Sequence, residues 1–186
     1  RCSGLVLPVL VCGVLVAVSA GSLFLGSSLT ELPWRIAIDS TGKEAILSSF
    51  SGRPLKRWSA PESGWMPFAE LVERPAQLGG GKVVALALDL QPRSGELCLF
   101  ETSNLESPYW TSASVPLRLP DGEVERTGTR FIVETCLVAD VFPEAPGEEI
   151  VVAHRLVPYS ATAVRVYDLT GALHYEAWHD GGLRGL

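Results

Sequence analysis

Hydrophobic and polar positions follow two different patterns along the chain. Residues 5–26 form an almost uninterrupted apolar run, and the first acidic residue is Glu31. From residue 34 onwards, short apolar runs alternate with clusters of Gly, Pro, Ser and Asp, a pattern that predicts β-strands joined by turns. The predicted strands cover residues 34–38, 44–50, 54–58, 82–89, 96–101, 109–118, 130–141, 149–156, 162–168 and 172–178, and residues 67–74 are predicted to form a short helix.

The apolar run at residues 5–26 has the length of a membrane span. As a helix it would extend roughly 33 Å, close to the bilayer's hydrocarbon thickness of about 30 Å. A cleaved signal peptide, with Val18-Ser19-Ala20 as its processing site, and a buried helix are the alternatives. The run continues beyond Ala20 through residues 23–25, which favours a retained transmembrane helix.

Charge around this segment suggests an orientation. Arg1 is the only charged residue before the apolar run, and positive charge favours the cytoplasmic side. We therefore expect residues 1–30 to form a transmembrane helix with its flanks, with a cytoplasmic N-terminus, and residues 31–186 to lie outside the cell membrane. Because the chain starts at Arg1 and not at methionine, we also expect further sequence upstream.

Three segments after the span share one template. Each has an apolar strand ending in Asp, then a turn with Gly, an acidic residue and a second apolar strand, and the three aspartates are Asp39, Asp89 and Asp140. An Asp that follows a strand commonly accepts backbone N–H bonds within its own turn. We therefore expect these aspartates to be structural turn residues, with neither a catalytic nor a metal-binding role.

The spacing of about 50 residues, with about four strands per unit, suits a β-propeller blade. The fold class predicted is all-β, with about three propeller-like blades near residues 34–80, 81–129 and 130–186, preceded by one transmembrane helix. Because closed propellers need at least four blades, the array is expected to be truncated here. Trp58, Trp110 and Trp178 recur at similar positions and are expected to pack between blades.

A family resemblance rests on the third unit. The segments Val138-Ala-Asp140, Gly147-Glu-Glu149-Ile-Val-Val152 and Val164-Arg-Val-Tyr-Asp168-Leu-Thr-Gly171 are similar to FG-GAP and VCBS-type repeats of bacterial extracellular propellers. The resemblance implies a propeller, and in that family the turn can bind calcium. These turns lack the alternating oxygen ligands that calcium requires, so no metal or other cofactor is expected. The layout also resembles membrane-anchored sensor proteins of planctomycete type, in which a kinase can precede the span.

Composition restricts the candidate chemistry further. Residues 31–186 carry 14 basic and 21 acidic side chains, which argues against nucleic-acid binding. No Gly-x-Ser-x-Gly elbow or phosphate-binding loop is present, and the histidines have no standard metal-ligand spacing. Cys98 and Cys136 either form a disulfide in an oxidising compartment or are two buried thiols, the interpretation that β-rich surroundings favour.

The function predicted from these features is binding. Trp65 lies off the repeat template in a loop and is the candidate contact for a protein or carbohydrate ligand. The chain is thus interpreted as a non-enzymatic, membrane-anchored binding or sensing domain of a larger protein, with the lipid bilayer as a partner through residues 5–26. The alternatives are an anchored or secreted hydrolase whose active residues lie outside this sequence, and a structural surface repeat.

Overall fold

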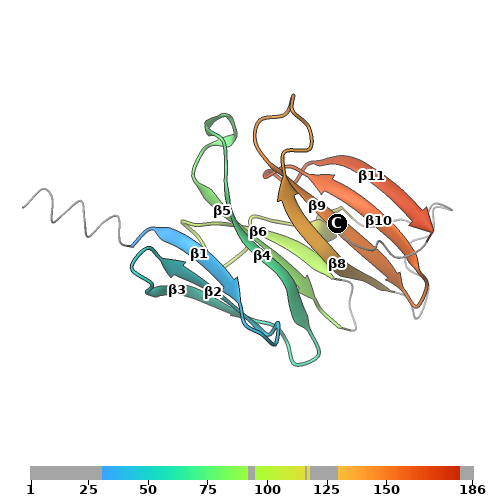
Figure 1. Cartoon of the computed structure of the whole chain (residues 1–186), viewed down its shortest axis with the longest axis horizontal. Coiled ribbons are helices and arrows are strands. Elements are labelled where there is room, and N and C mark those ends of the chain that lie inside the picture. Colours follow the sequence, from blue (N-terminus) through green and yellow to red (C-terminus); the bar gives the residue numbers. More distant parts are fainter. Residues whose placement is uncertain (1–30, 92–94, 116, 118–129, 181–186) are drawn as a thin grey trace, which may run out of the picture.

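Three antiparallel β-sheets follow one another across the molecule (Figure 1). The computed structural model describes residues 31–91, 95–115, 117 and 130–180. The predicted membrane span at residues 5–26 lies outside the described residues. Within the described ranges, no helix has the length and apolar character needed to cross a bilayer.

Every sheet is a meander in which each strand pairs with its neighbour in sequence. The first sheet contains β1 (Pro33–Ile38), β2 (Glu44–Ser49) and β3 (Pro54–Ser59). The central sheet contains β4 (Trp65–Glu73), β5 (Lys82–Asp89), β6 (Glu96–Glu101) and β7 (Trp110–Thr111). The third sheet contains β8 (Arg130–Ala139), β9 (Glu149–Val157), β10 (Ala161–Tyr167) and β11 (Leu173–Asp180). The described helices are the 3₁₀ turns Ala76–Leu78 and Ser112–Ser114.

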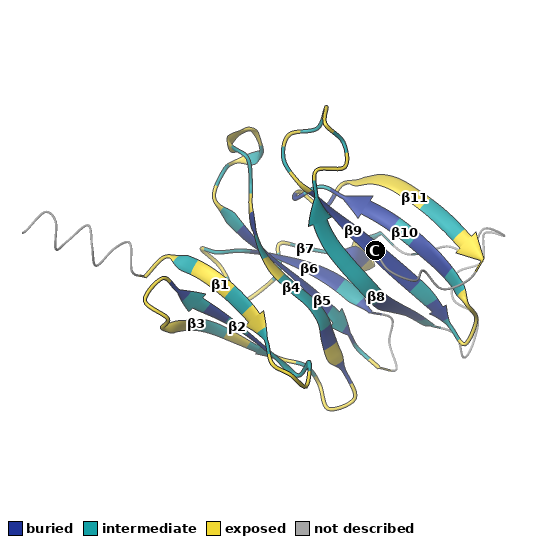
Figure 2. Cartoon of the chain, in the orientation of Figure 1, coloured by how far each residue is buried: buried dark blue, intermediate teal, exposed yellow. Residues whose placement is uncertain are grey.

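The central sheet is buried on both faces, and Figure 2 shows the buried residues along β5 and β6. Alternate residues of a strand point to opposite faces, so one set faces the first sheet and the other faces the third. Val84 and Leu86 pack with Ala45 and Leu47 of the first sheet. The intervening residues of β5 pack against Ile150 and the rest of the second core, in the third sheet. This arrangement explains why β5 has the uninterrupted apolar sequence Val83-Val-Ala-Leu-Ala87.

The helix predicted at residues 67–74 is wrong, because this segment belongs to the strand β4. Phe68, Leu71 and Val72 have the spacing of one helical face. In the structure Phe68 and Val72 pack toward the third sheet, whereas Leu71 packs toward the first. A strand buried on both faces carries apolar residues at adjacent positions, and a short one can imitate a helical pattern.

The all-β class is confirmed, and the sheets divide the chain differently from the predicted units. Strand β4, which the first predicted unit contained, is the first strand of the central sheet. In the described part of the strand predicted at residues 109–118, Trp110–Thr111 form a short strand and the 3₁₀ turn follows, while residues 116 and 118 lie outside the described residues. Trp58 packs on Phe100 and Trp110 on Tyr167, so both indoles lie between sheets as predicted. Trp178 packs instead on Phe131 of its own sheet.

The first sheet, unlike the central one, has one face that points away from the other sheets and carries charged side chains. The outward face of the first sheet carries the exposed Arg35 and the ion pair between Arg57 and Glu44, with 2.6 Å between nitrogen and oxygen. That face needs no further sheet to cover it.

The first strands of the three sheets are neighbours, since β1 lies against β4 and β4 lies against β8. The contacts between neighbouring sheets are therefore concentrated at their first strands.

Candidate functional site

An aromatic pocket lies between the first and central sheets, at the end of the molecule where the described chain begins. It has a volume of about 530 Å³ and is open to solvent. Trp34 comes from β1 and Phe50 from the turn after β2, while Lys82 begins β5. The lining residues are Leu32, Pro33, Trp34, Phe50, Gly81, Lys82 and Thr102. We call this set the aromatic pocket.

Local backbone structure presents the two aromatic rings together. Pro33 is compatible with β1 because β1 is an edge strand, where a missing N–H costs no ladder bond. The Phe50 N–H donates to the Leu32 carbonyl at 3.2 Å, which holds the turn against the start of β1. The rings of Trp34 and Phe50 then meet edge to face, with 5.0 Å between centroids. This is a favourable geometry for aromatic pairs.

Lys82 adds a positive charge beside these rings. Its Nζ lies 5.6 Å from the Trp34 ring centroid, within cation–π range, and 3.6 Å from the exposed Glu73 carboxylate. Among the lining residues that the structure describes, none is an acid, a histidine, a cysteine or a serine. The lining thus offers apolar surface, one ammonium group and one hydroxyl. These groups can hold an apolar ligand with a neighbouring anion, but they include no acid–base pair for turnover.

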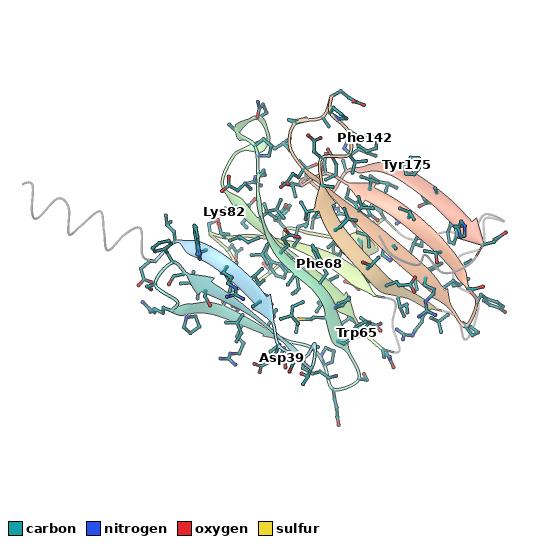
Figure 3. The ribbon with its side chains drawn as sticks, in the orientation of Figure 1. Asp39, Trp65, Phe68, Lys82, Phe142 and Tyr175 are labelled. Carbon is teal, nitrogen blue, oxygen red and sulfur yellow. The ribbon has the colours of Figure 1, made fainter. Side chains whose placement is uncertain are left out.

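Trp65, the predicted ligand contact, lies at the other end of the central sheet from Lys82 (Figure 3). Its side chain is 40 % exposed, and its indole N–H donates to Asp89 Oδ2 at 2.8 Å. The ring also faces Gly42 in the turn between β1 and β2, where an added β-carbon would lie 3.8 Å from it. Trp65 therefore links two sheets and is not part of the aromatic pocket.

Asp39 accepts bonds within its own turn. The N–H groups of Lys43 and Glu44 donate to its Oδ1 at 2.8 and 2.9 Å, and the Thr41 hydroxyl donates to Oδ2. The Thr41 hydrogen bond, followed by those from the backbone, lowers the pKa of Asp39 to about 2. Gly42 has φ +68°, a conformation that favours glycine.

Asp168 has the same role in a turn that the repeat template did not select. It accepts bonds from the N–H groups of Thr170 and Ala172 at 2.8 and 3.0 Å, and Gly171 has φ +89°. Burial raises the pKa of Asp168, but hydrogen bonds from His174 and Thr170 outweigh burial and lower it overall. The signal in the sequence was the tetrapeptide Asp-x-Thr-Gly, which occurs at residues 39–42 and 168–171.

Asp89 connects two sheets in addition to ending a strand. Its carboxylate is 2 % exposed and lies 2.5 Å from the Arg130 guanidinium at the start of β8. Trp65 supplies a second donor to the same carboxylate. Asp89 thus connects β4, β5 and β8. Its partner Arg130 is far away in the sequence, so the pattern of the turn around Asp89 does not predict this contact.

Asp140 is exposed and has no side-chain hydrogen bond among the described residues, whereas Glu149 is 1 % exposed. The Glu149 carboxylate accepts bonds from the N–H groups of Val141 and Phe142, at 2.8 and 3.3 Å. In this turn Glu149, from the following strand, accepts the backbone N–H bonds that Asp39 accepts in the turn between β1 and β2. No three His, Cys, Asp or Glu side chains in the described part of the chain converge on a possible metal position.

A polar cluster is buried in the third sheet. Arg165 is 3 % exposed and pairs with Glu176 across the strands β10 and β11, with Nε 2.6 Å from Oε2. His154 of β9 lies on the same face of the sheet as Arg165 and is 1 % exposed, and neither ring nitrogen has a hydrogen-bond partner within the described part of the chain. Burial, assisted by the positive charge of Arg165, lowers the pKa of His154 to about 3.

The two described cysteines are separated by the central sheet. Cys98 belongs to the core between the first and central sheets, while Cys136 packs against the core between the central and third sheets. Both are free thiols. Burial raises the pKa of Cys98 to about 12 and also raises that of Cys136.

Comparison with known proteins finds no matching family model, no similar curated protein and no similar solved structure.

Proposed function

We propose that this chain is a membrane-anchored binding domain that lies outside the cell membrane, with residues 5–26 as a single span and the N-terminus in the cytoplasm. The observation that carries the proposal is the aromatic pocket. Its exposed rings and its ammonium group are suited to holding a ligand and provide no catalytic pair. Its first lining residue, Leu32, follows the apolar run after only five intervening residues.

The architecture we propose is a propeller-type array. One three-stranded and two four-stranded meanders follow one another, with their first strands as neighbours, and stacked small antiparallel sheets are what propeller blades require. The likeness to FG-GAP and VCBS repeats belongs to this proposal. The polar outward face of the first sheet argues against a further blade packed on that side. A blade there would meet the ion pair between Arg57 and Glu44 and not an apolar face.

Membrane anchoring is tested with the full chain expressed in bacterial cells. We expect the protein to stay with membranes after alkaline extraction and to float with them in a density gradient. External protease should digest residues 31–186 in intact cells. The control variant carries Val11→Arg and Leu15→Arg, which place two charges in the span at a cost of about 3 kcal/mol each. A soluble product shortened near Ala20, or a domain protected from protease, would contradict the proposal.

Binding is tested by photo-cross-linking in the same cells. Phe50 is replaced with p-benzoylphenylalanine, and the matched control carries this residue at Tyr175, which is similarly exposed but lies on the distant strand β11. We expect an adduct at position 50 that is absent from position 175, and its mass distinguishes a lipid, a carbohydrate and a protein. Equal labelling at both positions, or none at position 50, would contradict a binding role for the aromatic pocket.

A further inference from the structure

Three of the residues that line the aromatic pocket expose more than half of their surface to solvent. Trp34, Phe50 and Leu32 are 59 %, 60 % and 54 % exposed, and all three lie at one end of the first sheet. Exposed apolar clusters of this kind usually mark a surface that contacts another molecule or a membrane. The folding of the described residues leaves these side chains exposed, so they are available for contact with another molecule or with a membrane.

We call Leu32, Trp34 and Phe50, together with the neighbouring Lys82, the patch. Its position in the chain restricts what can contact it. Residues 27–31 are the only link between the apolar run and Leu32, and five extended residues reach at most about 18 Å. If residues 5–26 cross the bilayer, as the proposed function states and as this inference requires, the patch cannot lie far from the membrane surface. A molecule bound to these residues would have to fit between the domain and the lipid headgroups. The alternative is that the residues contact the headgroups directly.

The chemistry of the patch matches a bilayer interface. Tryptophan is enriched at the level of the headgroups because its ring is apolar and its N–H is polar. Lys82 lies beside Trp34, and a lysine there can place its ammonium group among lipid phosphates while its methylene stem follows the apolar surface. A carbohydrate would fit less well, since the described lining residues include no carboxylate or amide side chain to bind sugar hydroxyls.

We propose that the patch formed by Leu32, Trp34, Phe50 and Lys82 inserts into the interface of the bilayer that residues 5–26 span. The domain then has two attachments to the membrane, the span and this patch, which fix its orientation. Trp65 lies at the opposite end of the pairing between β4 and β5. A strand of eight residues rises about 23 Å between its first and last residues, so Trp65 faces away from the lipid.

The test uses the full chain in vesicles made from zwitterionic and anionic lipids, with bromine atoms on the upper acyl chain as quenchers of tryptophan emission. Brominated vesicles should quench one component of the emission relative to vesicles without bromine. Trp34→Phe should remove that quenched component, which belongs to one of five tryptophans. The matched control Trp65→Phe should leave it unchanged. Both substitutions keep an aromatic ring at a partly exposed position, and Asp89 keeps its pair with Arg130 when the Trp65 indole is removed, so both variants should fold.

Each result decides between the possible explanations. Flotation with vesicles but no quenching of Trp34 would overturn the inference while leaving the anchoring proposal intact, and would favour a protein or carbohydrate occupant. Quenching that is lost in Trp65→Phe and kept in Trp34→Phe would also overturn it, because the domain would then be oriented the other way. A chain that does not float at all would overturn both the anchor and the inference. A second variant, Lys82→Glu, should reduce the quenching more on anionic than on zwitterionic vesicles.

Discussion

The indole of Trp110 lies directly against Gly171, across the interface between the central and third sheets. A β-carbon at Gly171 would fall 2.4 Å from three atoms of the Trp110 ring, and φ at this glycine is +89°. The same indole meets the Tyr167 ring at 5.0 Å between centroids. Trp65 lies less closely against Gly42, where an added β-carbon would be 3.8 Å from the ring, so the central sheet places one tryptophan beside each Asp-x-Thr-Gly turn of its neighbours.

Glycine is required at position 171 for two independent reasons, and we expect Gly171→Ala to be strongly destabilising. The positive φ alone should cost about 1 kcal/mol of unfolding free energy, and displacing Trp110 should add about 1–3 kcal/mol. Urea denaturation followed by circular dichroism measures the total. The control is Gly52→Ala, because Gly52 has φ +83° but no atom of the described residues lies within 4 Å of an added β-carbon.

A double-mutant cycle separates the two contributions. In a Trp110→Ala background, Gly171→Ala should cost no more than Gly52→Ala does, because the ring that opposes the β-carbon is gone. If the large penalty persists without Trp110, steric contact with the indole is not its cause.

The buried carboxylate of Asp89 predicts a second difference in stability. Asp89→Asn removes the charge that Arg130 pairs with at 2.5 Å, and we expect a loss of about 2–3 kcal/mol in unfolding free energy. Asp140→Asn is the matched control, since Asp140 is exposed and should change stability by less than about 0.5 kcal/mol. Thermal and urea unfolding of both variants test this. Similar losses at the two positions would mean that the tie between β5 and β8 is not important.

Much of the fold could be predicted from the sequence, because strand signals are local. The apolar runs at residues 82–89 and 96–101 correspond to the strands β5 and β6 without error. Which strand begins each sheet could not be predicted in the same way. Strand β4 joins the central sheet because Phe68 and Leu71 find partners on opposite sides, and those partners lie in different sheets.

The candidate site shows the same limit. The three template aspartates looked equivalent in sequence, yet Asp39 holds its own turn while Asp89 pairs with Arg130, which is 41 residues away in the chain. The aromatic pocket also needed the structure. Trp34, Phe50 and Lys82 come from three separate elements, and only the pairing within the first sheet and its packing on the central sheet bring them together.

The cysteines provide a prediction about redox behaviour. Because Cys98 and Cys136 belong to cores on opposite faces of the central sheet, no disulfide can join them without unfolding. A variant with Cys2→Ser and Cys12→Ser should therefore keep both thiols after treatment with oxidised glutathione. Alkylation should modify neither thiol in the native protein and both in urea, as mass spectrometry can measure. A loss of two mass units from the oxidised native protein would contradict the structure.

His154 predicts how stability depends on pH. Its pKa is lowered from 6.5 to about 3 in the folded protein, so the folded state keeps the ring neutral where the unfolded state takes up a proton. Above pH 6.5 both states are neutral and His154 makes no pH-dependent contribution. Between about pH 6.5 and 3, the unfolded state holds one proton more, and stability should fall by about 1.4 kcal/mol per pH unit from this residue.

Replacing the imidazole isolates this contribution from that of the carboxylates. His154→Leu removes the titrating group and two buried nitrogens for which the described residues offer no hydrogen-bond partner, so the variant should gain stability relative to the wild type as the pH falls from 6.5 to 4. Urea unfolding at several pH values measures the difference. Val152→Ala, on the same face of β9, is the control whose cost should be the same at every pH, because it removes no proton-binding group. Charges on Arg165 and Glu176 are present in all three proteins, so they cancel in the comparison. A difference between His154→Leu and the wild type that does not change with pH would show that His154 is not held neutral in the folded protein.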